Sequence, residues 1–186
     1  MRRTVPDGAA AGVFMGLGDA WYPAYVGLGS NLDDPAAQVR RALLALGQLP
    51  GTRLLRQSSL YGSKPMGPVA QPDYVNAVAG LLTQLEVADF FARLRDLEAA
   101  LGRTPPQQRW GPRRIDLDLL LFAQLRLESG QLRLPHPGIV ERNFVLYPLA
   151  EVAPELPVPG CGQVAQLAAR VSPEGIWRLD PAAAAS

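Results

Sequence analysis

Apolar residues recur at two spacings along this chain, and the two spacings predict its strands and helices. The stretch "AYVGLGS" at residues 24–30 is apolar and ends in glycines, which is typical of a short buried strand. Two later segments carry apolar residues every three or four positions, as one face of an amphipathic helix requires. These positions are Val39, Leu43 and Leu46 in the first segment, and Val87, Phe91, Leu94, Leu97 and Leu101 in the second.

Three further apolar runs predict strands, and two Pro-rich loops interrupt the regular structure. The runs occupy residues 53–61, 74–83 and 115–122, and the loops occupy residues 62–73 and 103–114. The order strand, helix, strand, strand, helix, strand predicts an α+β fold, a ferredoxin-like α/β sandwich with an antiparallel sheet. Both helices are then expected on one face of the sheet, which leaves the other face to a ligand.

The C-terminal part of the chain adds smaller elements to this core. Residues 124–137 predict a hairpin, and residues 139–152 predict a short helix or an extended cover. No element is predicted after about residue 160. We therefore expect a ferredoxin-like core with a C-terminal hairpin and helix addition.

Composition favours one domain with a small-molecule partner. The chain has 186 residues, 48% of them apolar, which suits a single core, expected at residues 24–180. We expect residues 1–23 to be a flexible N-terminal extension and residues 181–186 a disordered tail. A net charge of +1 provides no large basic field for nucleic acid.

The absence of a clean signal peptide or of a membrane-length segment predicts a cytoplasmic protein. The single cysteine, Cys161, argues against disulfides and against a Cys-based zinc cluster.

The stretch "RWGPRRIDLDLLLF" places two carboxylates on one face of a strand. Asp116 and Asp118 are two residues apart, so their side chains point the same way, while Leu117, Leu119 and Leu121 are expected on the opposite face. Like charges this close raise each other's pKa unless a cation offsets them, and oxygen ligands of this kind suit Mg²⁺ with substrate phosphates.

The spacing leaves a second interpretation open, in which Asp116 and Asp118 simply pair with Arg113 and Arg114 at the start of the strand. The surrounding arginines favour a polyphosphate, because guanidinium groups bind phosphate oxygens with two parallel hydrogen bonds. No glycine-rich phosphate loop is present in the sequence. The basic side chains that crowd the two turns before the carboxylates are Arg103, Arg109, Arg113 and Arg114.

A second pair of side chains is suited to a flat heterocycle. Tyr74 and Asn76 share one strand face, and they offer an aromatic plane beside an amide that both donates and accepts hydrogen bonds. A surface tyrosine beside an edge asparagine is the alternative. His136 is the only histidine, and without a second histidine or a nearby cysteine it is expected to form hydrogen bonds rather than bind a metal.

Four motifs in the same order resemble the 6-hydroxymethyl-7,8-dihydropterin pyrophosphokinase family. They are "GSNLDDP", "GPVAQPDYVNA", "RWGPRRIDLDLLLF" and "LPHPGIVERNFVLYPLAEVAPEL", and the similarity spans residues 24–160. The resemblance implies a ferredoxin-like monomer, an ATP-dependent diphosphokinase of folate biosynthesis that transfers diphosphate to the hydroxymethyl group of the pterin and releases AMP.

The resemblance also implies a role for each matching residue. Asp116 and Asp118 would hold two Mg²⁺ ions that bridge the phosphates of ATP, the co-substrate, and Arg103 and Arg113 would assist the transfer. The residues implied to bind the pterin are Ser63, Met66, Tyr74, Asn76, Trp110 and Phe144. Those implied to bind ATP are Glu98, Arg109, Arg113, His136 and Arg142.

The chain departs from the family pattern at four positions. Lys64 replaces a frequent proline, Pro105 and Gln131 stand where arginines are common, and Pro137 stands where a tyrosine often follows the histidine. Two other function classes are compatible with parts of this sequence. A ferredoxin-like sheet also serves as an RNA-recognition surface, although the RNA-binding aromatic signature is absent. A non-catalytic partner in a folate-enzyme complex is the other alternative.

Overall fold

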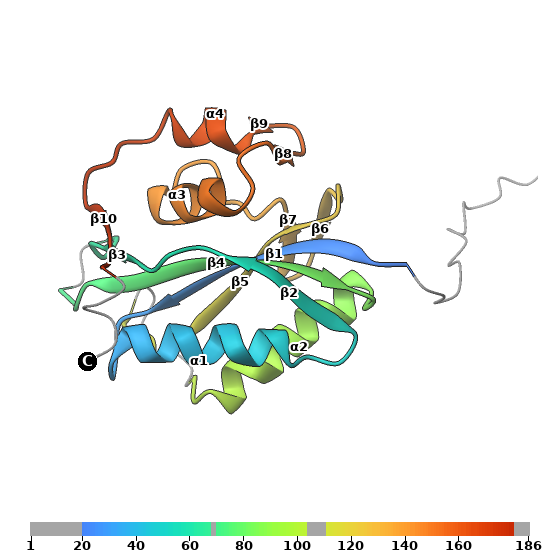
Figure 1. Cartoon of the computed structure of the whole chain (residues 1–186), viewed down its shortest axis with the longest axis horizontal. Coiled ribbons are helices and arrows are strands. Elements are labelled where there is room, and N and C mark those ends of the chain that lie inside the picture. The colour runs from blue at the N-terminus through green and yellow to red at the C-terminus, as the bar shows by residue number, and fades with distance from the viewer. Residues whose placement is uncertain (1–19, 68–69, 104–110, 181–186) are drawn as a thin grey trace, which may run out of the picture.

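Helices cover both faces of a six-stranded antiparallel sheet in this computed structural model, which describes residues 20–67, 70–103 and 111–180 (Figure 1). The sheet order is β10-β3-β4-β1-β5, and β2 also pairs with β4. This confirms the predicted mixture of helices and antiparallel sheet. The predictions of a flexible extension and a disordered tail fall on residues outside the described ranges, apart from residues 20–23.

The elements follow the predicted order through β5 and then continue further than predicted. The sheet strands are β1 (Tyr22–Ser30), β2 (Thr52–Gln57), β3 (Tyr61–Ser63), β4 (Tyr74–Thr83), β5 (Asp116–Phe122) and β10 (Ile176–Arg178). The helices are α1 (Pro35–Gly47), α2 (Val87–Ala100), α3 (Asn143–Val152) and α4 (Val164–Ala168). Two small ladders are formed by β6 (Leu127–Ser129) with β7 (Leu132–Leu134), and by β8 (Pro157–Val158) with β9 (Gly162–Gln163).

The main core lies between the sheet and the pair α1 and α2. Helix α1 begins with Pro35 after Asp34, whose side chain accepts a hydrogen bond from the N–H of Ala37 at 3.1 Å and so caps the helix. Fully buried Leu46 of α1 and Phe90 of α2 belong to the same apolar cluster on this face. Both helices therefore lie on one face, as the sequence predicted.

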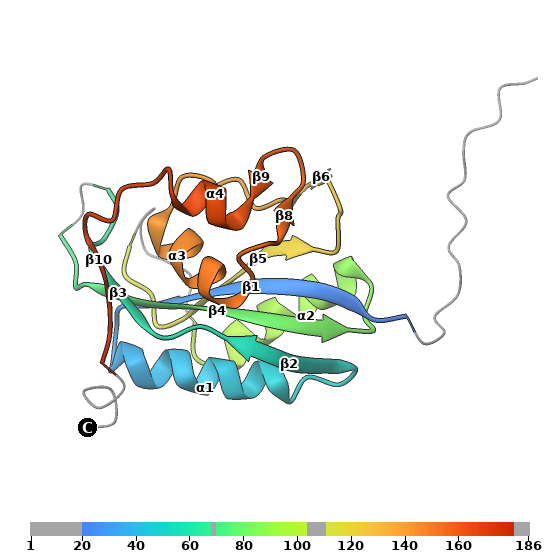
Figure 2. The ribbon, with the colours of Figure 1, turned by 45° about the horizontal axis from the view of Figure 1, so that its top comes forward.

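Helices α3 and α4 cover part of the second face of the sheet (Figure 2). The sequence predicted that this whole face would be left to a ligand, and only the uncovered part of it is. Leu146 and Leu149 of α3 are fully buried in a separate apolar cluster with Val164 and Leu167 of α4. Helix α4 was not predicted, because its five residues are too short to show a helical period.

A β-bulge in β5 changes the face on which the distal leucines lie. Tyr25 pairs with Leu121 and the next residue, Val26, pairs with Leu119. Leu120 is therefore an extra residue of β5 that has no pairing partner in β1. Leu117 and Leu119 pack with α1 and α2 as expected, but Leu121 packs on the α3 side. The predicted alternation was therefore wrong at Leu121, whereas it holds for the segment that carries the two aspartates.

The bounds and number of the strands also differ from the prediction. Strand β1 begins at Tyr22, two residues before the expected start at residue 24. The predicted strand at residues 53–61 is divided into β2 and β3 near Ser58, whose N–H donates to the carbonyl of Val78 while its hydroxyl accepts from the N–H of Val78, both at 2.9 Å. The last strand, β10, pairs with β3 although no element was predicted there.

We predict that Gly80→Ala lowers the free energy of unfolding by about 1–3 kcal/mol. Gly80 lies in β4 under the end of α3, and a Cβ there would stand 3.1 Å from Cγ1 of Val152. Denaturant unfolding measures the loss, and combining the change with Val152→Ala should give less than the sum of the two single losses. As a control, Gly47→Ala places its Cβ at an ordinary 3.5 Å from Leu54. Equal unfolding free energies for Gly80→Ala and the wild type would contradict the packing argument.

Candidate active site

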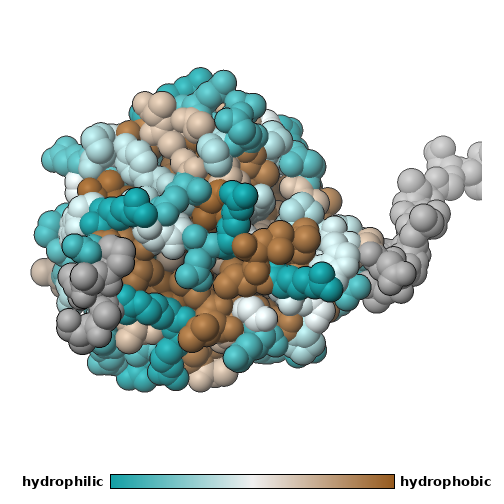
Figure 3. Space-filling model, viewed as in Figure 1, coloured by the Kyte–Doolittle hydropathy of each residue, from teal (hydrophilic) through white to brown (hydrophobic). Residues whose placement is uncertain are grey.

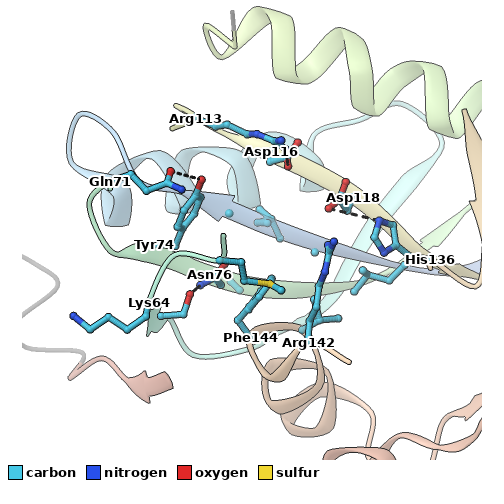
Figure 4. Close-up of a pocket in the computed structure, with 18 residues that line it drawn as sticks. Lys64, Gln71, Tyr74, Asn76, Arg113, Asp116, Asp118, His136, Arg142 and Phe144 are labelled. Carbon is cyan, nitrogen blue, oxygen red and sulfur yellow. Dashed lines mark hydrogen bonds and ion pairs between the residues drawn. The ribbon is translucent and has the colours of Figure 1, made fainter. Parts of the chain in front are cut away.

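A cavity of about 360 Å³ opens on the second face of the sheet, beside the first turn of α3 (Figure 4). It collects side chains from β1, β4 and β5, from the loop after β3 and from the start of α3. The predicted site residues that line it are Ser63, Met66, Tyr74, Asn76, Arg113, Asp116, Asp118, His136, Arg142 and Phe144.

Two glycines of β1 form the floor between the acidic and the amide sides of this cavity. Gly29 pairs with Asp116 on one side and Asn76 on the other, and Gly27 pairs with Asp118. A Cβ at Gly29 would stand 3.3 Å from Oδ1 of Asn76. The missing side chains keep the floor flat, so a planar ligand has room between strands β4 and β5.

The carboxylate of Asp116 is held by two arginines from the loop before β5 and the end of α2. Arg113 Nη1 donates a hydrogen bond to Oδ2, and Arg103 Nη2 lies 2.9 Å from Oδ1 in an ion pair. Oδ1 is nevertheless buried and makes no hydrogen bond of its own. The predicted pairing of Arg113 with Asp116 is therefore present, whereas Arg114 instead binds Asp33 at the surface.

Asp118 is the more open of the two carboxylates. Its side chain is 36% exposed, against 17% for Asp116. Burial raises the pKa of Asp118, and the nearby charge of Asp116 raises it further, while His136 and two arginines oppose the change. A cation bound at Asp118 would oppose this change, because it favours the charged carboxylate.

His136 faces Asp118 across the edge of the cavity. Its Nδ1 accepts a hydrogen bond from the N–H of Gly138 at 3.1 Å, so the proton of the neutral ring is on Nε2, 3.8 Å from Oδ2 of Asp118. Burial lowers the pKa of His136, and the charge of Asp118 opposes that change. The ring therefore presents an N–H donor to the cavity, in agreement with its predicted hydrogen-bonding role.

Glu98 lies behind the cavity and does not line it. Its side chain is 2% exposed; Oε1 accepts a hydrogen bond from the N–H of Leu117 at 2.6 Å, and Oε2 pairs with Arg103 and, at 2.8 Å, with Arg95. Burial raises the pKa of Glu98 to about 7 even though both arginines lower it. Glu98 thus connects α2 to β5 and holds Arg103 beside Asp116. It lines neither cavity, and its predicted contact with ATP stays a prediction.

The opposite wall combines two aromatic rings with an amide. Tyr74 Oη donates a hydrogen bond to Oε1 of Gln71 at 3.1 Å, and Nδ2 of Asn76 donates to Oγ of Ser63 at 2.9 Å. Phe144 reaches the same cavity from the first turn of α3 (Figure 4). The shared face predicted for Tyr74 and Asn76 is confirmed, and both side chains point into the cavity.

A buried asparagine connects the two loops that flank this wall. Asn31 Nδ2 donates hydrogen bonds to Oε1 of Gln71 at 3.0 Å and to the carbonyl of Pro72 at 3.2 Å, and its Oδ1 accepts from the N–H of Arg113 at 2.8 Å. Asn31 lies in the motif "GSNLDDP", whose sequence alone indicates no role for this side chain. Only the fold shows that the end of β1 lies between both loops.

A second cavity of about 260 Å³ adjoins the first and shares Asp118 and His136 with it. Its other walls are formed by Phe91, Arg95, Leu119, Gln131, Leu132, Arg133 and Pro137. Sequence reasoning missed Arg95, which lies on α2 three residues before Glu98. The i,i+3 spacing of opposite charges on a helix was the available signal.

The carboxylates provide a partial set of metal ligands. Within the described residues, no group of three or more His, Cys, Asp or Glu side chains could hold a metal ion. Two carboxylates on one strand face, one of them with a buried oxygen that makes no hydrogen bond, nevertheless suit Mg²⁺, which takes one or two carboxylates and completes its shell with water and substrate phosphates. Arg109 and Trp110, and also Pro105, lie outside the described residues.

Comparison with known proteins identifies the family. The model of the 7,8-dihydro-6-hydroxymethylpterin-pyrophosphokinase (HPPK) family matches residues 25–154. The chain belongs to this family. It is 46% identical to the pyrophosphokinase of Pseudomonas aeruginosa over 155 residues, which cover 83% of this chain and 95% of that relative. The enzyme of Haemophilus influenzae is 40% identical over 158 residues, covering 85% and 98%.

The fold of this HPPK is also found among solved structures. The Plasmodium falciparum wild-type HPPK-DHPS with pteroate superposes with a TM-score of 0.66 at 12% identity. The similarity covers 84% of this chain and 43% of that chain, so this HPPK spans less than half of the solved protein. Among the described residues, no helix has the length and apolar character needed to cross a membrane.

The HPPK activity is pyrophosphoryl transfer from ATP to 6-hydroxymethyl-7,8-dihydropterin in folate biosynthesis, and this confirms the function predicted from the resemblance. Ten of the residues predicted for that activity line the first cavity, Arg103 and Glu98 are not part of its lining, and Arg109 and Trp110 lie outside the described residues. Their roles in the activity remain predictions.

We predict that the stability of this HPPK relative to its Glu98→Gln variant falls as the pH rises from 5 to 8. The pKa of Glu98 is about 7 in the folded protein against an ordinary 4.5, so the folded state binds this proton more tightly and loses the advantage as the pH rises. Denaturant unfolding at several pH values measures the difference, with the exposed Glu155→Gln as control. A difference that grew with pH would show that Arg95 and Arg103 outweigh the cost of burying the carboxylate.

Proposed function

We propose that the first cavity binds the pterin and the second binds the nucleoside of ATP, so that the diphosphate lies at their shared edge. The observation that carries this proposal is the position of Asp118 and His136, which line both cavities. A bond between the pterin oxygen and the β-phosphorus must form where the two substrates meet. The acidic pair lies at that place.

The first cavity has the shape and chemistry for a pterin. Tyr74 and Phe144 offer aromatic faces for stacking, and the amide of Asn76 offers a donor and an acceptor to the polar edge of the heterocycle. Ser63 and Met66 border the same space from the loop after β3. Stacking supplies affinity, while hydrogen bonds to a fixed amide discriminate against rings that lack the matching groups.

The second cavity combines apolar and basic side chains. Phe91 and Leu132 provide apolar surface for a nucleobase, and Arg95 and Arg133 add positive charge. Gln131 also lines this cavity, at a position where the family resemblance implied an arginine. We therefore propose that Arg95 and Arg133 provide part of the positive charge expected from an arginine at residue 131.

At the shared edge, arginines stabilise the transferred group. Arg103 and Arg113 already converge on Asp116, and Arg142 extends from the start of α3 toward Asp118 (Figure 4). Their guanidinium groups would bind the phosphate oxygens and stabilise the charge that moves to AMP as the β-phosphorus is transferred. The chain thus contributes mainly positioning and electrostatic stabilisation.

Asp116 and Asp118 are the side chains that would hold the two Mg²⁺ ions. When bound with ATP, these ions would neutralise phosphate charge and orient the β-phosphorus toward the hydroxymethyl group. Asp118 is open to the cavity, and the buried Oδ1 of Asp116 lacks a hydrogen bond. Both features leave carboxylate oxygens that a cation at this edge could bind, although Arg103 and Arg113 already offset the charge of Asp116.

We also propose that β1, α1, β2 with β3, β4, α2 and β5 form a ferredoxin-like core. The support is the β3-β4-β1-β5 order with α1 and α2 on one face. Strands β6 and β7, helices α3 and α4 and strand β10 are then additions to this core, and of these β7 and α3 contribute residues to the cavities. We expect a monomer, which size-exclusion chromatography with light scattering would test.

Asp118→Asn should reduce pterin-dependent AMP release by more than about 100-fold, because it removes a carboxylate proposed to hold Mg²⁺. The assay follows AMP from ATP and Mg²⁺ with and without 6-hydroxymethyl-7,8-dihydropterin. Asp96→Asn, an exposed acid on α2, serves as the control and should retain wild-type turnover. Wild-type turnover in Asp118→Asn would refute the metal assignment, and pterin binding without AMP release by the wild type would indicate a non-catalytic relative.

Arg113→Ala should lower kcat by about 10²–10³-fold while the Kd for ATP changes by less than about fivefold, since the contact strengthens as charge develops. Single-turnover kinetics and calorimetry separate the two quantities. The adjacent Arg114→Ala is a matched control, because Arg114 pairs with Asp33 at the surface. A loss of ATP affinity with kcat unchanged would assign Arg113 to ground-state binding instead.

A further inference from the structure

Residues 171–179, here called the C-terminal strap, run from the end of α4 back to the edge of the sheet. The strap passes the start of α3 and ends as β10 beside β3 (Figures 1 and 2). It lies beyond residues 25–154, which the HPPK family model matches. Neither cavity includes a strap residue in its lining. Any effect on the site must therefore act through the elements that the strap contacts.

One end of the strap holds the first turn of α3. Asn143 Nδ2 donates hydrogen bonds to the carbonyls of Ser172 and Glu174, both at 2.9 Å. One turn later, Tyr147 Oη donates to the carbonyl of Val171 at 3.2 Å. Asn143 directly precedes Phe144, which lines the first cavity, so these bonds fix the aromatic wall contributed by α3.

The other end of the strap holds β3 and the loop that follows it. Ile176 pairs with Ser63 and Trp177 pairs with Gly62 in the antiparallel ladder. A Cβ at Gly62 would overlap the indole ring of Trp177, so the absence of a side chain lets the ring lie directly on β3. Ser63 is the residue whose Oγ accepts from Asn76, and it is held between this ladder on one side and its pairing with Tyr74 of β4 on the other.

Lys64 extends the attachment around the cavity. Its backbone N–H donates to the carbonyl of Gly175 at 2.8 Å, a bond that a proline at this position could not make. Its Nζ lies 2.9 Å from Oδ2 of Asp73 and 5.6 Å from the centre of the Trp177 ring. Asp73 directly precedes Tyr74, so Lys64 connects the strap to both ends of the loop between β3 and β4.

We propose that the C-terminal strap positions the two walls of the first cavity relative to each other and thereby sets the affinity for the pterin, but not for ATP. The inference rests on the proposed assignment of the pterin to this cavity. Phe144 is on α3 and Ser63 is on β3, and the strap bonds to both elements. Walls that are already fixed lose little conformational freedom when the pterin binds, so less of the binding free energy is spent on ordering them. No described residue that lines only the second cavity is bonded to the strap in this way.

Two changes at opposite ends of the strap test this proposal in the full-length protein. Asn143→Ala removes both amide donors to the strap, and Trp177→Ala removes the ring that packs on Gly62. Each should weaken binding of 6-hydroxymethyl-7,8-dihydropterin about 3–10-fold in calorimetry, while binding of a non-hydrolysable ATP analogue with Mg²⁺ stays within about twofold. Trp177→Phe should restore most of the pterin affinity, because a ring again covers Gly62.

Gln166→Ala, an exposed amide on α4 that does not contact the site, is the matched control and should leave both affinities unchanged. Thermal unfolding curves show whether each variant is folded at the temperature of the binding measurements. Folded Asn143→Ala and Trp177→Ala proteins with wild-type pterin affinity, or with equal losses for pterin and ATP analogue, would overturn the strap's role. A wild-type protein that binds no pterin in calorimetry would instead overturn the proposed function, and the inference with it.

Discussion

The crowding of Asp116 and Asp118 on one strand face is the constraint around which the site is built. Two carboxylates this close repel each other, and Arg113 and Arg103 compensate Asp116 directly. Arg103 is in turn held by the buried Glu98, which also accepts the N–H of Leu117. The charge pattern of the site therefore depends on a buried carboxylate outside it, and α2 is as much a part of the active site as the strand itself.

Local periodicity was sufficient to predict which side chains of the site share a strand face. The alternation of side chains along a strand placed Asp116 with Asp118, and Tyr74 with Asn76, and the structure confirms both pairs on the cavity face. The same rule failed at Leu121, because a bulge at Leu120 shifts the register against β1. A bulge is decided by the pairing of two distant strands, so the sequence of one strand does not reveal it.

The parts that sequence reasoning missed all depend on contacts between distant segments. Arg95 lies in the second cavity because α2 crosses β5, and Asn31 joins two loops because β1 ends between them. Lys64 was noticed only as a departure from the family pattern. Its N–H gains a partner when β10 arrives at the edge of the sheet, more than 100 residues later in the chain. Asn31 and Lys64 show no local pattern that differs from an ordinary surface, and the i,i+3 charge spacing of Arg95 does not reveal the cavity that it lines.

The ion pairs of the site also indicate how substrates can enter it without leaving charges unpaired. Arg103 and Arg113 bind Asp116 in this structure, and under the proposed mechanism they would bind phosphate oxygens, with Asp116 among the residues that would hold Mg²⁺. Each charged group would then keep a partner of opposite charge, which avoids the large cost of a buried and uncompensated charge. The arginines thus stabilise Asp116 before the substrates bind, and the same guanidinium groups would be placed to stabilise the phosphates of ATP when it is bound.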